Sequence, residues 1–153
     1  MDAQSINIFL EALVNVLGEY GVENIVKKNI MKKEVMNVDM DITALIGLTG
    51  EIKGNVAYSF GIDTGKRLVS AMMMGTQINE IDSMGRSAIG EIANMITGRA
   101  GMLFSNTGKT FNVTPPSLVF GKNVVFVISS VDTIAVDLDT SFGKIQVNIG
   151  LEG

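Results

Sequence analysis

Apolar residues recur at helical spacing near the start of the chain. Between residues 5 and 20 they form a single stripe made of Ile6, Phe9, Leu10, Leu13, Val16, Leu17 and Tyr20. Such a stripe is typical of a helix that packs one side against a core. Gly21 follows the last apolar residue, as is common at a helix C-terminus. The pattern therefore predicts a first helix over residues 5–20.

Between residues 34 and 60 the period changes from that of a helix to that of a strand. Residues 35–42 alternate between apolar and polar side chains, residues 44–49 form an apolar run, and residues 55–60 follow. Gly50 and Gly54 enclose a short polar piece between the last two segments. We expect strands in this region, with a hairpin near residues 51–54.

Two further helices are predicted in the middle of the chain. Asp63 or Thr64 is a suitable N-cap for a short helix that ends by residue 74, where Gly75 follows. Asp82 or Ser83 is a suitable N-cap for a long helix that reaches residue 104 or 105. The long helix carries most of the residues that bear on function.

The last part of the chain is predicted to be extended. Pro115 and Pro116 prevent helix formation and favour extended chain. Strands are expected at residues 117–120, 124–130, 135–138 and 144–151, with a hairpin turn at residues 140–143 joining the last two.

The order of elements favours an α+β fold, in which helices gather on one side of an antiparallel sheet. We expect the two long helices to pack on one face of that sheet. The succession of helix and strands occurs twice, which suggests a loose internal duplication. Because no linker or low-complexity stretch divides the 153 residues, we expect a single domain over residues 1–153.

Composition restricts the chemistry that this protein can perform. The net charge of −4 argues against nucleic acid as the main partner, because phosphate binding needs a basic surface. The chain has no cysteine and no histidine, which excludes thiolate nucleophiles, zinc–sulfur sites and the commonest general base. Catalysis would have to use carboxylates, amides, hydroxyls or lysines.

The sequence gives no indication of a membrane protein. Its first residues lack the basic flank and apolar stretch of a signal peptide, and no apolar run approaches the roughly 18 residues that a membrane span needs. We therefore expect a cytoplasmic protein that does not associate with a membrane.

The long helix has two different sides when successive residues are placed about 100° apart. One side is apolar and consists of Ile89, Ile92, Ala93, Ile96, Ala100 and Leu103. The opposite side carries Ser87, Glu91, Asn94, Gly98 and Gly101. Glu91 and Asn94 are three residues apart, so their side chains are neighbours on the outward side.

Glycines are unexpectedly frequent in this helix. Gly90, Gly98 and Gly101 each cost about 1 kcal/mol relative to alanine in a helix interior. A glycine permits close approach of another backbone, which can belong to a partner protein or to a neighbouring element of the same chain. A Glu–Asn pair at this spacing is common by chance, so these features alone do not decide between a binding surface and a plain solvated one.

Residues 87–98 resemble the characteristic helix of the CheC, CheX and FliY phosphatase family, which carries a Glu-x-x-Asn motif. Glu91 and Asn94 match that motif. Residues 6–17 look like the first helix of the family, and residues 46–54 look like its glycine-bounded hairpin. Segments 114–121 and 142–144 also fit, so the resemblance covers nearly the whole chain.

The resemblance implies a CheC-like fold and hydrolysis of the aspartyl phosphate of a CheY-type response regulator. Asn94 would orient the attacking water, and Glu91 would dock to a lysine of the regulator. Ser87, Gly98 and Gly101 are the further positions expected to bind the partner. No cofactor or metal is implied on this chain, whereas Mg²⁺ is expected on the phosphorylated partner. CheX relatives join their sheet edges, so a homodimer is expected.

The first helix differs from that of CheC-like members of the family. Those members carry a second Glu-x-x-Asn motif there, whereas this chain has Glu11, Val14 and Asn15, a spacing of four rather than three. We therefore expect one active site per chain, which favours a CheX-like protein. The alternative is a non-catalytic module that binds response regulators or belongs to a motor or signalling assembly.

Three other groups of residues are given structural interpretations. Methionines 72–74 are expected to fill core space, and the lysines at 27–28 and 32–33 are expected to be solvated. Asp137 and Asp139 alternate along a strand and so share one face, but no further ligand lies near them in the sequence. We therefore expect no metal site.

Overall fold

The computed structural model describes residues 2–152 and contains helices and strands in alternating groups. In chain order they are α1 (Ala3–Glu19), β1 (Val26–Lys33), β2 (Met36–Val38), β3 (Ile42–Gly50), β4 (Gly54–Phe60), α2 (Ile62–Met72), α3 (Ser83–Ser105), β5 (Phe111–Val113), β6 (Ser117–Phe120), β7 (Phe126–Ser129), β8 (Thr133–Thr140) and β9 (Gly143–Leu151). Among residues 2–152, none of these helices has the length and apolar character that crossing a membrane requires.

Seven strands form the main sheet, and every pairing in it is antiparallel. The order is β1-β8-β9-β4-β3-β5, with β6 also paired to β3. Strand β3 pairs with β6 through residues 42–45 and with β5 through residues 48–50. The chain between β5 and β6 therefore runs along one edge of β3, where it meets α3. The predicted antiparallel sheet is confirmed.

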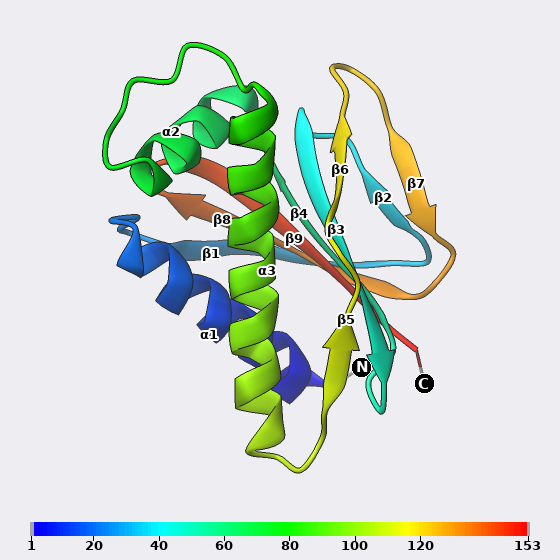
Figure 1. Cartoon of the computed structure of the whole chain (residues 1–153). Helices are drawn as coiled ribbons and strands as arrows, with labels where there is room; N and C mark the ends of the chain where they lie inside the picture. The colour runs from blue at the N-terminus through cyan, green and yellow to red at the C-terminus, as the bar shows by residue number, and fades with distance from the viewer. Residues whose placement is uncertain (1, 153) are drawn as a thin grey trace.

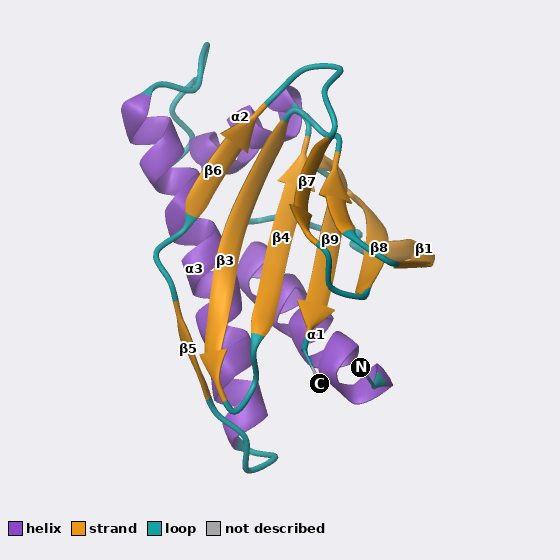
Figure 2. Ribbon diagram, turned by 90° about the vertical axis from the view of Figure 1, so that its right-hand side faces the viewer, coloured by secondary structure: helices purple, strands orange, loops and turns teal. Residues whose placement is uncertain are grey.

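The two faces of the sheet are covered differently. Helices α1 and α3 lie on one face, and Figure 2 shows them behind the strands. The two-stranded sheet β2–β7 covers part of the other face, where Met36, Val38 and Ala57 form a small second core. The predicted packing of two long helices on one face is confirmed, whereas the second layer was not predicted. The internal duplication stays a prediction.

Helix ends agree with the sequence patterns except at α2. Asp82 caps α3, since its Oδ1 accepts a hydrogen bond from the Gly85 amide at 2.9 Å. The N-cap of α2 is Gly61, so the prediction of Asp63 or Thr64 is wrong. The free amide of Ile62 instead donates to Asp41 Oδ2 at 3.0 Å, from a residue distant in the sequence.

Strand prediction succeeded for the centre of the sheet and for β6 and β7, and it failed for β1 and β5. The hairpins near residues 51–54 and 140–143 are confirmed by the pairs Leu48–Gly54 and Thr140–Gly143. Strands β1 and β5 were not predicted, and the expected continuous strand over residues 35–42 contains only β2 and the first residue of β3. Strand β1 is an exposed edge strand rich in lysine, a composition that discourages pairing with other chains and conceals the strand pattern.

Candidate active site

The orientation of α3 is determined by its buried side. Ile89, Ala93 and Ala100 are at most 1% exposed, and Leu103 is partly buried against the same core. Because this side faces the sheet, the opposite side of the helix faces away from it. Ser87, Glu91 and Gly98 are exposed and Asn94 is half-buried. The predicted core-facing side is confirmed, and Ser87, Glu91 and Gly98 are exposed as predicted, whereas Gly101 is half-buried.

A buried hydrogen-bond chain ties α3 to the sheet three residues after Asn94. The Thr97 hydroxyl donates to the Ala93 carbonyl at 2.8 Å and lies 2.8 Å from the Tyr58 hydroxyl of β4. Since a threonine hydroxyl has a single proton, Tyr58 is the donor to Thr97. Burial raises the pKa of Tyr58, so the phenol stays neutral and keeps this role.

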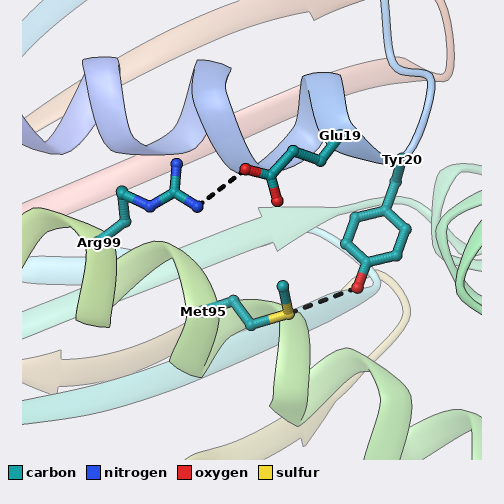
Figure 3. A network of polar contacts seen from close by, with 4 residues as sticks. All are labelled: Glu19, Tyr20, Met95 and Arg99. Carbon is teal, nitrogen blue, oxygen red and sulfur yellow. Dashed lines mark hydrogen bonds and ion pairs between the residues drawn. The ribbon is translucent and has the colours of Figure 1, made fainter.

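Two polar contacts join α3 to the end of α1 (Figure 3). Arg99 Nη2 lies 2.8 Å from Glu19 Oε1, and the Tyr20 hydroxyl donates to Met95 Sδ at 3.6 Å. Met95 follows Asn94 directly, and Arg99 follows Gly98. These contacts, together with the packing of α1 on α3, restrict rotation of the helix about its axis. The direction in which Asn94 points is restricted in the same way.

The segment between β5 and β6 forms a wall beside the outward side of α3. Thr114 anchors it to β3, because its amide donates to the Gly47 carbonyl and its Oγ1 accepts from the Gly47 amide, both at 2.9 Å. Pro116 then packs on Gly90, where a Cβ atom would lie 3.2 Å from Pro116 Cγ. A larger side chain at position 90 would push this wall away from the helix.

Helix and wall together enclose a shallow surface hollow of about 400 Å³. Its lining combines the motif residues with their neighbours: Arg86, Ser87, Gly90, Glu91, Asn94, Pro116 and Leu118. Arg86 is held on the ring of Phe120, 5.0 Å from its centre. The structure thus brings Ser87, Glu91 and Asn94 into one site. Sequence reasoning did not place Arg86, Pro116 or Leu118 there, although the double proline marked an unusual extended segment.

Gly90, Gly98 and Gly101 occupy different surroundings. Gly98 has open space around it, with nothing within 4 Å of the position a Cβ atom would take. Gly101 lies against the ring of Phe111, whose nearest atom is 3.3 Å from that position. Gly90 lies under Pro116. For Gly90 and Gly101, the element that approaches the helix belongs to this chain, which is one of the two possibilities open from the sequence.

The side chains of Glu91 and Asn94 are free to interact with a partner molecule. Across residues 2–152, neither the Glu91 carboxylate nor the Asn94 amide forms a hydrogen bond or an ion pair. The amide can donate and accept at once, and the carboxylate can accept from a cation. In this hollow the amide can therefore position a water molecule and the carboxylate can bind a cation, but neither group is a strong base.

The other candidates from the sequence lie apart from this hollow. Glu11, Val14 and Asn15 are exposed on α1. Asp137 accepts a hydrogen bond from Gln146 at 2.9 Å, and Asp139 lies 3.9 Å from Lys28. Within the described residues, no three carboxylates are grouped in a way that would hold a metal ion.

Comparison with known proteins identifies relatives of this chain by sequence. The family model for the chemotaxis phosphatase CheX matches residues 42–139, which include all of α3. The CheY-P phosphatase CheX of Thermotoga maritima is 33% identical over 126 residues, covering 81% of this chain and 80% of that protein.

Solved structures share the fold along the full chain. A CheC-like superfamily protein from Shewanella is 28% identical with a TM-score of 0.88, and each chain is covered completely. The matching chain of a CheX–CheY–BeF₃–Mg²⁺ complex from Borrelia burgdorferi is 23% identical with a TM-score of 0.80, covering 97% of both chains. From the family model and the Thermotoga relative together, this chain belongs to the CheX family of chemotaxis phosphatases.

Proposed function

We propose that this protein is a phosphatase that hydrolyses the aspartyl phosphate of a CheY-type response regulator. The observation that carries the proposal is the outward pair Glu91 and Asn94, free of internal partners, on a helix of a CheX-family fold. The Thermotoga relative is a CheY-P phosphatase, and the Borrelia relative was crystallised with CheY, BeF₃ and Mg²⁺. Both support a phosphorylated receiver domain as the substrate.

The reaction needs little from the phosphatase beyond placement of water. An acyl phosphate is reactive, and the Mg²⁺ expected on the receiver domain would neutralise charge on the phosphoryl oxygens. Water attacks phosphorus in line with the departing carboxylate oxygen, the old P–O bond breaks, and aspartate and inorganic phosphate remain. The Asn94 amide would accept a hydrogen bond from that water and hold its oxygen in line.

Glu91 would act as a docking residue. Its exposed carboxylate, one turn before Asn94, is placed to pair with a lysine in the receiver's active site. Such a pair becomes partly desolvated when the two proteins meet, so it is stronger than an ordinary surface ion pair. Glu91 would thus set the depth at which Asn94 enters.

The test is release of phosphate from a phosphorylated receiver domain. Asn94→Ala is expected to lower the stimulated rate by about 100-fold or more, because a misplaced water loses the advantage of alignment, while some binding remains. Glu91→Ala is expected to weaken binding and rate together. Asn15→Ala is the matched control, since Asn15 is exposed on α1, and it should leave the rate unchanged.

Two outcomes would contradict the proposal. A normal rate for Asn94→Ala would remove that residue from the mechanism. Failure of the unmodified protein to release phosphate at substoichiometric amounts would favour the alternative, a module that binds the regulator without turnover. Assays with each receiver domain of the same cell would identify the substrate.

A further inference from the structure

The outward side of α3 is longer than the motif. At about 100° per residue, Met84, Gly98 and Met102 all lie within about 20° of the direction of Glu91. Ser87 and Asn94 lie slightly to one side of this line. The stripe therefore has a methionine at each end, with the motif and a bare glycine between them. Its length from residue 84 to residue 102 is about 27 Å at a rise of about 1.5 Å per residue.

Both methionines are largely exposed. Met84 and Met102 each have 66% of their surface accessible, although the opposite side of α3 is almost completely buried. Gly98, between them, has no atom within 4 Å of its outward side. Among the described residues, no element of this chain covers the stripe between Glu91 and Met102.

The polar centre explains why apolar contacts would lie at the ends of the stripe. Glu91 and Asn94 must face a charged active site, so they contribute no apolar contact to binding. A single carboxylate opposite a lysine gives modest affinity in water. Flexible thioether side chains adapt to an irregular surface and gain free energy when they are buried. Contacts on either side of the motif would supply the affinity that the centre lacks.

Building on the proposed function, we propose that Met84 and Met102 are apolar anchors for the same phosphorylated receiver domain. The occupant follows from two observations. The stripe is about as long as a small domain is wide, so one receiver placed on Asn94 reaches both ends. The acidic Glu91 at the centre suits a receiver whose active site contains lysine and Mg²⁺. The anchors would position the receiver along α3 while the motif sets its depth.

The experiment is a calorimetric titration with a CheY-type receiver domain held in its activated form by BeF₃ and Mg²⁺. Met84→Gln and Met102→Gln keep side-chain length and helix propensity but remove the apolar end. Each is expected to raise Kd roughly three- to tenfold. The double variant should show the product of the two effects, because the sites are too far apart to interact.

Matched controls separate anchoring from general loss of structure. Met31→Gln changes a methionine of 43% exposure on the edge strand β1 and should leave Kd unchanged. Met84→Leu and Met102→Leu retain the apolar surface, so their Kd should lie within about twofold of the value for the unmodified protein. Circular dichroism checks that every variant is folded.

Each outcome decides the inference separately from the proposed function. If Asn94→Ala abolishes hydrolysis but both glutamine variants bind normally, the anchoring role of the two methionines is wrong and the proposed phosphatase activity is supported. If the glutamine variants weaken binding while Asn94→Ala hydrolyses normally, the anchoring role of the methionines is supported and the catalytic role of Asn94 is wrong. Changed self-association with unchanged Kd would assign the methionines to contact between copies of this chain. That result would overturn the inference.

Discussion

At the scale of single residues, three glycines of α3 differ in what lies against them. Gly98 is open on its outward side, beside Glu91 and Asn94. Gly90 makes room for Pro116, and Gly101 makes room for Phe111. Both partners come from the chain after the helix, and helical periodicity contains no information about such contacts.

The open position of Gly98 leads to a prediction about docking. Gly98→Lys should fold normally, because a side chain there meets no neighbour. It should weaken receiver binding by about tenfold or more, since it places bulk and positive charge beside the motif. Titration with the activated receiver measures the effect. Gly18→Lys on α1 is the matched control, because its outward side is equally open. Unfolding of Gly98→Lys would show instead that this glycine is covered.

At the scale of elements, contacts of different strength determine how α3 is held. The Arg99–Glu19 pair is substantially exposed, with 31% and 51% of the side chains accessible, so we expect it to contribute at most about 1 kcal/mol. The Tyr58–Thr97 hydrogen bond is buried, so loss of one partner leaves a polar atom unsatisfied. The attachment of α3 to the sheet is therefore the more important of the two.

Tyr58→Phe tests this attachment and its dependence on pH. The variant is expected to lower the free energy of unfolding by about 1–2 kcal/mol at neutral pH, because Thr97 loses its donor. The pKa of Tyr58 is raised in the folded state, so its contribution is complete below the ordinary tyrosine pKa of about 10 and declines as the pH rises further.

Urea unfolding of both proteins across this range is the measurement. The unmodified protein should lose stability more steeply than Tyr58→Phe above about pH 10. The difference between the two proteins removes every effect of pH that they have in common. Equal slopes would mean that the Tyr58 phenol ionises as readily in the folded chain as in the unfolded one.

At the scale of the whole molecule, the sequence predicted the central sheet and the helical layer but not β1, β5 or the pairing of β2 with β7. Strands β3, β4, β8 and β9 and helices α1 and α3 have strong periodicity because one large core selects their residues. Strand β1 is paired on one side only and exposed along its length, and β5 has three residues, so neither leaves a pattern. The β2–β7 layer depends on a pairing between distant segments, which periodicity does not encode.

The homodimer expected from the family resemblance stays a prediction at this scale. Sedimentation equilibrium is expected to give twice the chain mass of 16.3 kDa. Dilution to low micromolar concentration would show whether the association is weak. A mass of one chain at every concentration would rule the dimer out, and the activity proposed for α3 would then belong to the single chain.

The motif residues stand on a helix surface beside a shallow hollow, and not within a deep cleft. Figure 1 shows α3 at the front of the molecule, before the strands of the sheet. Sites for small molecules usually surround most of the ligand, which this surface does not do. A metabolite such as acetyl phosphate would contact too few residues at this surface to bind tightly. We therefore expect phosphorylated metabolites to be poor substrates, because the substrate protein has to supply the rest of the enclosing cavity.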